Sequence, residues 1–282
     1  MTEIAGKTLF ITGCASGIGR ALVKHAIAHG AARVIATDVD TTGLARTADQ
    51  ARGLGSGAVE THRLDVADRD GVHALADSVT ADFGTPDIVI NNAGVALFAE
   101  VADMTYDDFR WVMDIDFWGM VYGTKAFLPG MMARGSGHLV NVSSIFGTVA
   151  FPGNSAYNAA KFGIRGFTEA LRHEMTVNGT GVEVSWVQPG GIKTNVARSA
   201  RLAQKEELLA RKDEIAANFD EIAKTTPEEA ARVICAGIAR NRPRILIGRD
   251  ARMMDRVQRL FPASYSWVFE RAWKTSRFRD QE

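Results

Sequence analysis

The sequence has few of the features that stabilise a small secreted or membrane-inserted fold. It contains two cysteines, Cys14 and Cys235, in 282 residues, so no disulfide framework is expected. This low cysteine content is consistent with a protein of a reducing compartment. No uninterrupted apolar run reaches the ~18 residues of a spanning helix. Residues 1–7 do not join a basic stretch to an apolar one, so no secretory leader is expected. We therefore predict a cytoplasmic protein.

The chain also lacks an excess of charge of either sign. Lys and Arg together number 33, as do Asp and Glu, so the formal net charge is zero. Nucleic-acid binders usually carry a basic excess, and no such partner is expected here. What is present is an ordinary globular balance, 46% hydrophobic and 23% charged, over a length that suits one large α/β domain or two small ones.

Short apolar segments alternate with helix-like segments along the whole chain. The predicted strands cover residues 8–12, 33–37, 58–64, 87–90, 137–143, 181–187 and 244–248. The predicted helices cover residues 20–28, 69–83, 107–134, 156–177, 195–225 and 227–239. This alternation predicts an α/β fold, a doubly wound parallel sheet with helices on both faces. Ligands of such sheets bind beyond the carboxyl ends of the strands. The residues expected to gather there are Gly13, Asp38, Asp65, Asn91 and Ser144.

A glycine-rich turn joins the first predicted strand to the first helix. Gly13 would permit the tight turn, Gly17 would let the backbone approach a pyrophosphate, and Gly19 would allow close helix packing. The helix N-terminus would favour the negative charge. The spacing G-x-x-x-G-x-G fits the general G-x-G-x-x-G pattern only loosely, so a glycine-rich turn without a ligand is the alternative.

Asp38 ends the second predicted strand, 19 residues after Gly19. That distance is close to the ~20 expected for an acid that binds the adenosine ribose. A carboxylate there accepts hydrogen bonds from the ribose hydroxyls and repels a 2′-phosphate, and neither Ser16 nor Val39 supplies a compensating cation. NAD is therefore favoured over NADP. The alternative interpretation is a turn residue at the end of a strand.

Tyr157 and Lys161 lie one helical turn apart on one face of a predicted helix. An ammonium group there lowers the pKa of the phenol, which could then take a proton from an alcohol or give one to a carbonyl. Ser144, at the end of the apolar run 137–143, could hold the same substrate oxygen. A Tyr-x-x-x-Lys pair by itself is weak evidence, because it arises often by chance.

Together these motifs resemble the classical short-chain dehydrogenase/reductase family. The resemblance covers about residues 5–248 and rests on Thr12-Gly13-x-x-x-Gly17-Ile18-Gly19, Asn91-Asn92-Ala93-Gly94, Ser144, Tyr157-x-x-x-Lys161 and Pro189-Gly190. It implies a single Rossmann-type domain over residues 1–248 and reversible hydride transfer between NAD(P) and an alcohol or carbonyl.

The resemblance also implies a role for each matching residue. Tyr157 would be the acid/base, Lys161 would bind the nicotinamide ribose and lower the phenol pKa, and Ser144 would orient the substrate oxygen. Asp65 and Val66 would border the adenine. The other implied cofactor residues are Ser16, Ile18, Asn91, Asn92, Ala93, Gly94, Pro189, Gly190, Ile192 and Thr194, of which Ile192 and Thr194 would contact the nicotinamide amide and phosphate.

Asp116 departs from the family, because many members have an asparagine there that holds a water in the proton relay to the lysine. An ionised aspartate accepts a hydrogen bond from water but cannot donate one as an amide does. Its charge would also raise the pKa of Lys161. We hypothesise a catalytic role for Asp116 in a working relay with an altered pH profile; a tolerated near-isostere is the alternative.

Two segments of the second half are expected to lie near the substrate. Residues 195–225 form a charged, helix-like insertion that in the family covers the substrate, although a solvated amphipathic helix is the alternative. Residues 249–282 form a helical extension with aromatic and basic side chains, expected to pack on the same domain rather than to lie on a membrane surface. Phe146 and Phe151 would line an apolar substrate pocket.

We thus predict an NAD-dependent oxidoreductase that acts on a lipophilic secondary alcohol or ketone. The alternatives are an NADP-dependent carbonyl reductase and a catalytically silent dinucleotide-sensing protein. The resemblance implies a homodimer or homotetramer built through the long helices. No metal site is expected, because His25 and His29 lack the H-E-x-x-H pattern. Cys14 is interpreted as a small loop residue, although a helix N-terminus can acidify a thiol.

Overall fold

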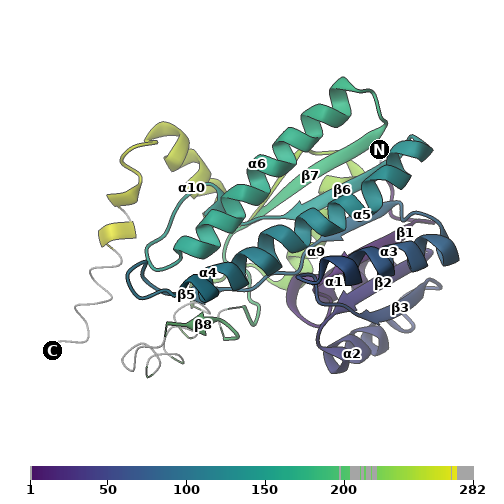
Figure 1. The fold of residues 1–282 in the computed structure, drawn as a ribbon, viewed down its shortest axis with the longest axis horizontal. Helices are drawn as coiled ribbons and strands as arrows, with labels where there is room; N and C mark the ends of the chain where they lie inside the picture. Colours follow the sequence, from purple (N-terminus) through teal and green to yellow (C-terminus); the bar gives the residue numbers. More distant parts are fainter. Residues whose placement is uncertain are drawn as a thin grey trace.

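A seven-stranded parallel sheet forms the centre of the fold, and helices cover both of its faces (Figure 1). The computed structural model describes residues 2–196, 198–203, 210, 213, 217, 221–267 and 269–271. The strand order is β3-β2-β1-β4-β6-β7-β9. The strands are β1 (Thr8–Thr12), β2 (Arg33–Asp38), β3 (Ala58–Arg63), β4 (Ile88–Asn91), β6 (Gly137–Val142), β7 (Val182–Pro189) and β9 (Arg244–Ile247). The predicted strands and the predicted doubly wound sheet are thereby confirmed, each boundary within two residues.

Alternate residues of the buried strands point into two separate cores, as the period of a strand requires. Leu9 and Ile11 of β1 join the core beneath α1 (Gly17–Ala28), α2 (Thr41–Ala51) and α9 (Pro227–Ala239). Phe10, between them, joins the core on the opposite face. That face is covered by α3 (Arg69–Phe83), α5 (Gly119–Arg134) and α6 (Ser155–Val177). The strands are apolar on both sides because both faces are covered.

The predicted helix over 107–134 is interrupted. It consists of α4 (Tyr106–Val112), a π-helical segment η1 (Met113–Trp118) and α5. A π-helical segment carries an extra residue within the helix, and apolar spacing alone does not reveal it. The sequence analysis also missed α2, which begins where the Asp40 carboxylate accepts a hydrogen bond from Gly43 N at 2.9 Å.

The prediction of a helix over 195–225 is wrong at its beginning. Residues Arg201–Leu202 form a short strand, β8, that pairs in parallel with β5 (Leu97–Phe98). The pairing ties this segment to the chain that follows β4, which a sequence pattern local to either segment does not predict. Most of the remaining predicted helix lies outside the described residues.

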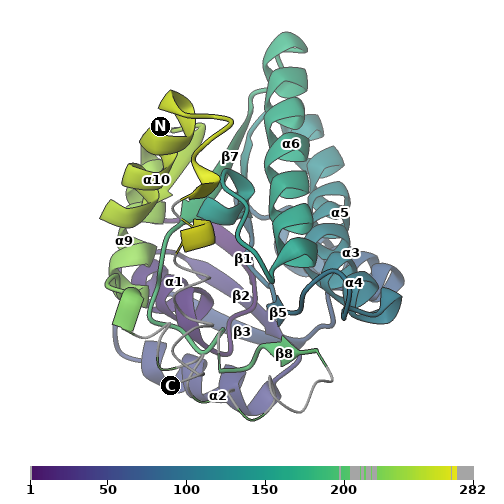
Figure 2. The same ribbon diagram turned by 90° about the vertical axis from the view of Figure 1, so that its left-hand side faces the viewer.

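The chain continues beyond β9 into α10 (Arg249–Leu260), which contacts β9 and the 3-10 turn η2 (Ile145–Gly147). Residues 261–267 and 269–271, which follow α10, lie beside the loop that leads from β6 to α6 (Figure 2), where Phe269 joins Ile145 and Val149 in one apolar cluster. The C-terminal part of the predicted extension, residues 272–282, lies outside the described residues. None of the described helices combines the length and apolar character needed to cross a bilayer.

Candidate active site

The loops at the carboxyl ends of β1 and β4 are joined by hydrogen bonds. Thr12 Oγ1 accepts from Asn92 N and from Ala93 N, each at 3.0 Å. The amide of Asn92 donates to Thr12 O at 2.9 Å and to Gly13 O at 3.2 Å. The predicted cofactor residues of these two loops therefore form one continuous surface.

The glycine turn is shaped for close approach of another group. Gly13 has φ +72°, and a Cβ there would lie 2.8 Å from Ala93 Cα. Gly17 has φ +51°, and a Cβ there would lie 3.1 Å from Thr194 Cγ2, so the loop after β7 borders the turn. Larger side chains would fill the space above the N-terminus of α1. These features fit the pyrophosphate of a dinucleotide.

Cys14, within this turn, is buried, and its thiol donates to Ile11 O at 3.1 Å. Burial raises the pKa of the thiol well above its ordinary value, and the Asp38 charge adds to this, although a backbone hydrogen bond of Thr37 in β2 acts in the opposite direction. The structure thus excludes the acidified thiol that a helix N-terminus can produce.

Asp38 lies at the end of β2, beside the glycine turn. Its Oδ2 accepts from Ala15 N at 2.9 Å and its Oδ1 accepts from Asp40 N at 3.0 Å. Each carboxylate oxygen retains a lone pair, so both can accept from a ribose as well. The guanidinium of Arg20 does not pair with Asp38; it donates to Ala15 O and to Thr47 Oγ1.

Asp65 and Val66 follow β3 at the same edge, whereas the Asn91 side chain lies inside the fold. Val66 is buried, and a Cβ on Gly119 would lie 2.7 Å from its Cγ2. The amide of Asn91 donates to Thr124 Oγ1 at 3.1 Å and to Asn141 Oδ1 at 2.8 Å. The Asn91 side chain therefore ties β4 to β6 and α5 and does not point toward a ligand.

Three predicted catalytic side chains converge where η2 meets α6. Ser144 immediately precedes η2, and its Oγ accepts from Phe146 N at 3.1 Å. The Ser144 hydroxyl lies close enough to the Tyr157 phenol to act on its pKa, which it lowers. Lys161 Nζ lies 5.3 Å from the centre of the Tyr157 ring. The serine, tyrosine and lysine therefore occupy one site.

Lys161 pairs with Asp116, the residue at which the chain departs from the family pattern. Its Nζ lies 3.0 Å from Asp116 Oδ2, and the two side chains are 4% and 0% exposed. Asp116 Oδ1 accepts from Val95 N at 2.7 Å, and Lys161 Nζ donates to Val142 O at 3.3 Å. Asp116 belongs to the π-helical segment η1, a feature frequent at functional sites.

Gly94 makes room for this ion pair. A Cβ at Gly94 would lie 3.2 Å from Lys161 Nζ and 3.3 Å from Asp116 Oδ2. Gly94 also continues the loop that carries Asn92 and Ala93, which contact the glycine turn. One short loop thus borders both the predicted catalytic lysine and the predicted dinucleotide site.

Burial and the neighbouring charges act in opposite directions on the titrating groups. Burial raises the pKa of Tyr157; Lys161 acts to lower it, and Asp116 raises it further. Lys161 therefore acts on the phenol in the predicted direction, but desolvation outweighs the ammonium, so the pKa of Tyr157 is raised overall. Burial acts to lower the pKa of Lys161, but Asp116 and Tyr157 more than offset this, so the net shift is upward. Burial raises the pKa of Asp116 as well, against the opposing effect of Lys161.

A row of aromatic rings leads from Tyr157 to the C-terminal segment. Phe146 lies edge-on to Tyr157, with ring centroids 6.2 Å apart, and stacks on Phe151 at 5.7 Å. Phe151 contacts Phe269 at 5.5 Å, and Phe269 contacts Tyr265 at 6.2 Å. The Tyr265 hydroxyl accepts from Ala150 N at 3.1 Å. The sequence indicated aromatic residues after position 249, but not which of them reach this row.

Asp250 is a positioning residue that the sequence analysis missed. Its Oδ2 accepts from Gly191 N at 2.6 Å, and a Cβ on Gly190 would collide with its carboxylate. The first turn of α10 therefore holds the loop that carries the predicted cofactor residues Pro189, Gly190, Ile192 and Thr194. Its sequence offers no motif; only its position two residues after Gly248, at the end of the last strand, hints at this contact.

Comparison with known proteins gives consistent results. The family model described as short chain dehydrogenase matches residues 7–205. The oxidoreductase SadH of Mycobacterium tuberculosis is 48% identical over 265 residues, which cover 94% of each chain. The trans-4-hydroxycyclohexanecarboxylate dehydrogenase of Sinomonas cyclohexanicum is 35% identical over 196 residues, 68% of this chain and 74% of that relative. A short chain dehydrogenase/reductase from Burkholderia phymatum, solved in complex with NAD, matches with a TM-score of 0.84 at 29% identity and covers 92% of this chain and 95% of its own.

Proposed function

The chain belongs to the short-chain dehydrogenase family of oxidoreductases, and we propose that it transfers a hydride between NAD and a lipophilic secondary alcohol or its ketone. The observation that carries the proposal is the convergence of Ser144, Tyr157 and Lys161 beside a loop that also borders the glycine turn. Acid/base chemistry and a dinucleotide would therefore meet at one edge of the sheet.

Each catalytic side chain has a distinct task in this proposal. Bound NAD would supply the hydride acceptor. Tyr157 takes the hydroxyl proton of the alcohol, and Ser144 holds the same oxygen beside the phenol. Lys161 stays charged because its pKa is raised, and its ammonium stabilises the phenolate. Asp116 holds Lys161 through its Oδ2, and this oxygen keeps a lone pair that can accept from a water.

We assign NAD rather than NADP on the basis of Asp38. Its carboxylate is fixed by two backbone N–H groups at the end of β2, where it would face the ribose hydroxyls and repel a 2′-phosphate. Replacement of Asp38 by alanine is expected to improve the use of NADP about tenfold or more while weakening the use of NAD. Preference for NADPH by the unaltered protein would overturn this assignment.

The aromatic row supports an apolar substrate. Phe146 and Phe151 would flank a substrate held at Ser144, and Phe269 would extend the apolar surface away from the reacting oxygen. One relative is named for a hydroxylated cyclohexane ring, which is a secondary alcohol on an apolar frame. Since NAD is the assigned cofactor, we propose oxidation of the alcohol as the favoured direction.

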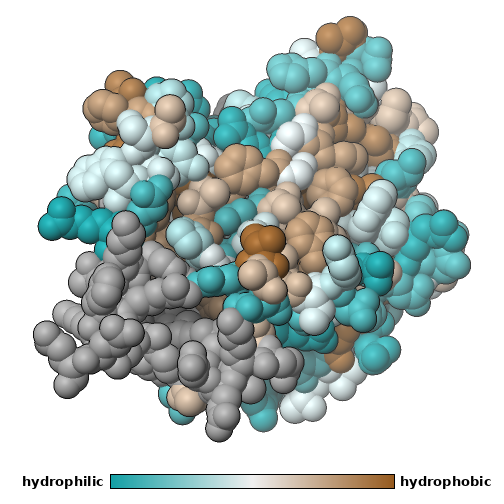
Figure 3. Space-filling view, turned by 60° about the vertical axis from the view of Figure 1, so that its left-hand side comes forward, coloured by the Kyte–Doolittle hydropathy of each residue, from teal (hydrophilic) through white to brown (hydrophobic). Residues whose placement is uncertain are grey.

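We also propose an assembly and a domain organisation for the protein. Apolar side chains lie on the face over α5 and α6 (Figure 3). Exposed aromatic residues of these helices and of the adjoining η1 include Phe162 of α6, 41% exposed, and Trp118 at the end of η1, 44% exposed. Such a patch suits burial against a second copy, so we propose a homodimer or homotetramer. We further propose a cytoplasmic enzyme with one domain over 1–248, a substrate lid over 195–225 and an extension from 249 packed on that domain.

A paired experiment tests the function. The purified protein is titrated with NADH and with NADPH by fluorescence, and a panel of secondary alcohols is then screened for reduction of NAD. Tighter binding of NADH, together with turnover that disappears in Tyr157→Phe, is expected. Turnover that survives in Tyr157→Phe would contradict the assigned base. Tight binding without turnover of any alcohol would favour a dinucleotide-sensing protein instead.

A further inference from the structure

A groove of about 470 Å³ lies outside the active site, along the edge of the sheet at β9. Its walls come from α9, from the segment that leads into β9, and from α10. None of its lining residues belongs to the predicted active site. Six arginines line it: Arg232, Arg240, Arg242, Arg244, Arg252 and Arg256.

This concentration of positive charge is local. Residues 232–259 contain eight arginines, no lysine and two acids, Asp250 and Asp255, in a chain whose formal net charge is zero. The basic side chains of the protein are therefore not spread evenly over its surface. The fold gathers arginines from two helices and a strand around one concavity.

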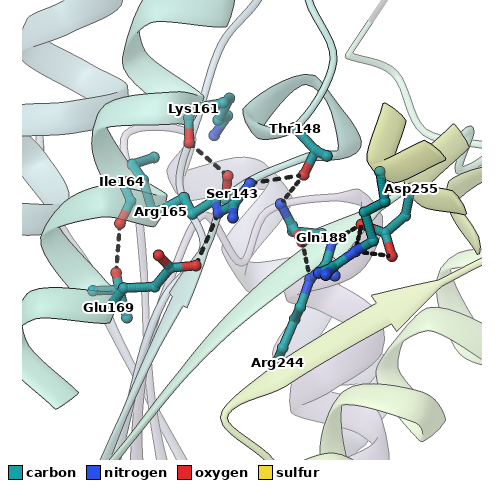
Figure 4. A network of polar contacts seen from close by, with 11 residues as sticks. Ser143, Thr148, Lys161, Ile164, Arg165, Glu169, Gln188, Arg244 and Asp255 are labelled. Carbon is teal, nitrogen blue, oxygen red and sulfur yellow. Dashed lines mark hydrogen bonds and ion pairs between the residues drawn. The ribbon is translucent and has the colours of Figure 1, made fainter. Parts of the chain in front are cut away.

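Both acids of this segment are already engaged. Asp255 accepts from Arg244 at 2.6 Å and from Arg259 at 3.1 Å, and these bonds lower its pKa although burial acts to raise it (Figure 4). Asp250 is bonded to Gly191 N. Arg244 is held further by Gln188 Oε1, which accepts from its Nε at 2.6 Å (Figure 4).

The other five arginines of the groove remain exposed, and they form no ion pair within the part of the chain that the structure describes. Like charges around a concave, low-dielectric wall reinforce one another and attract a counter-ion. Guanidinium groups also match phosphate oxygens through pairs of parallel hydrogen bonds.

We propose that this groove binds a phosphate-bearing ligand with more than one negative charge. Its volume lies within the range of about 300–1,000 Å³ typical of small-molecule sites. The same chemistry is offered by a free polyphosphate and by the head groups of an anionic phospholipid. The groove is a separate site, because it shares no residue with the predicted dinucleotide site.

A second copy of the chain is a poorer occupant. β9 is the last strand in the order of the described sheet, and an exposed edge strand can pair with another edge. Symmetric pairing at β9 would bring the two sets of arginines face to face, which like-charge repulsion opposes.

The test uses tripolyphosphate and vesicles, with NADH present at saturation so that the dinucleotide site is filled. Tripolyphosphate binding is measured by calorimetry, and vesicle binding by flotation with phosphatidylcholine alone or mixed with phosphatidylglycerol. The double variant Arg252→Ala/Arg256→Ala is compared with Arg69→Ala/Arg110→Ala, which removes the same charge from exposed arginines of α3 and α4. Both variants should retain wild-type NADH affinity, which serves as the folding control.

We expect at least one probe to bind the wild type and the control, and to bind at least tenfold more weakly to the groove variant. Binding of tripolyphosphate alone assigns a free anion, and flotation with phosphatidylglycerol alone assigns a lipid head group. Equal binding by both variants, or binding of neither probe to the wild type, overturns the proposal. The proposal is also overturned if the wild type self-associates in a salt-sensitive way and the groove variant does not. If the variant fails to fold, it is replaced by Arg232→Ala/Arg240→Ala, which changes one arginine of α9 and the C-cap residue that follows it.

Discussion

The active site and the β9 groove differ in how their charged side chains are balanced. In the active site Lys161 and Asp116 are almost fully buried and are paired at 3.0 Å. At the groove, arginines lie exposed on α9 and α10, and the one acid that lines it, Asp255, is already bonded to Arg244. The comparison shows what burial imposes: an interior charge must be balanced within the fold, whereas a solvated charge can be left for a ligand.

The largest expected effect comes from breaking the interior pair. Lys161→Met leaves Asp116 buried without its cation, which costs on the order of 3–5 kcal/mol of unfolding free energy. Turnover should vanish as well, since the phenolate loses its ammonium. Denaturant unfolding measures the first effect, and NAD reduction measures the second. Asp116→Asn/Lys161→Met is the control, because removing both charges should restore most of the stability. A stable single variant would mean that the pair is neutral in the folded protein.

A second contrast sets a buried aromatic ring against an exposed one. Phe269 is 8% exposed and Trp267 is 60% exposed, although only one residue separates them. Phe269→Ala should raise KM for an apolar alcohol about 10- to 100-fold, corresponding to roughly 1–3 kcal/mol of lost contact, with NADH affinity unchanged. Trp267→Ala should change KM little. Equal effects of the two variants would remove Phe269 from the substrate site.

A smaller effect is expected from Asp116→Asn, which tests whether the buried Asp116 carboxylate acts on the catalytic base. The Asp116 charge raises the pKa of Tyr157, so Asp116→Asn should lower that pKa. Alcohol oxidation requires the phenolate, and its rate rises with pH through the phenol pKa. The rising limb of the kcat/KM profile should therefore move to lower pH, while the near-isosteric side chain preserves the fold. A limb that stays in place, or moves to higher pH, would show that Asp116 does not influence the base.

The smallest effect is expected at the groove. Arg252→Ala/Arg256→Ala removes like charges that repel one another, so Tm should rise slightly at low ionic strength. The difference should fade in high salt, because screening already suppresses the repulsion there. Thermal unfolding at two salt concentrations provides the measurement. A fall in Tm at both concentrations would show that these side chains stabilise α10 through packing.

The sequence was informative where the signal is local. The seven strands and the glycine turn follow from apolar runs and from glycine spacing, both readable within a few residues. The pairing of β5 with β8 and the contact of Phe151 with Phe269 join segments more than 100 residues apart, so no local pattern contains them. The direction of the Tyr157 shift also depended on burial, which a sequence motif does not specify.

Because Asp250 contacts Gly191, α10 connects the β9 groove to the loop after β7. The helix carries Asp250 and the groove residue Arg252 in its first turn, and the groove residue Arg256 in its second turn. A ligand in the groove that shifts α10 must shift the loop after β7 as well, and with it the affinity for a dinucleotide. Thermodynamic reciprocity then requires the dinucleotide to change the affinity of the groove by the same factor.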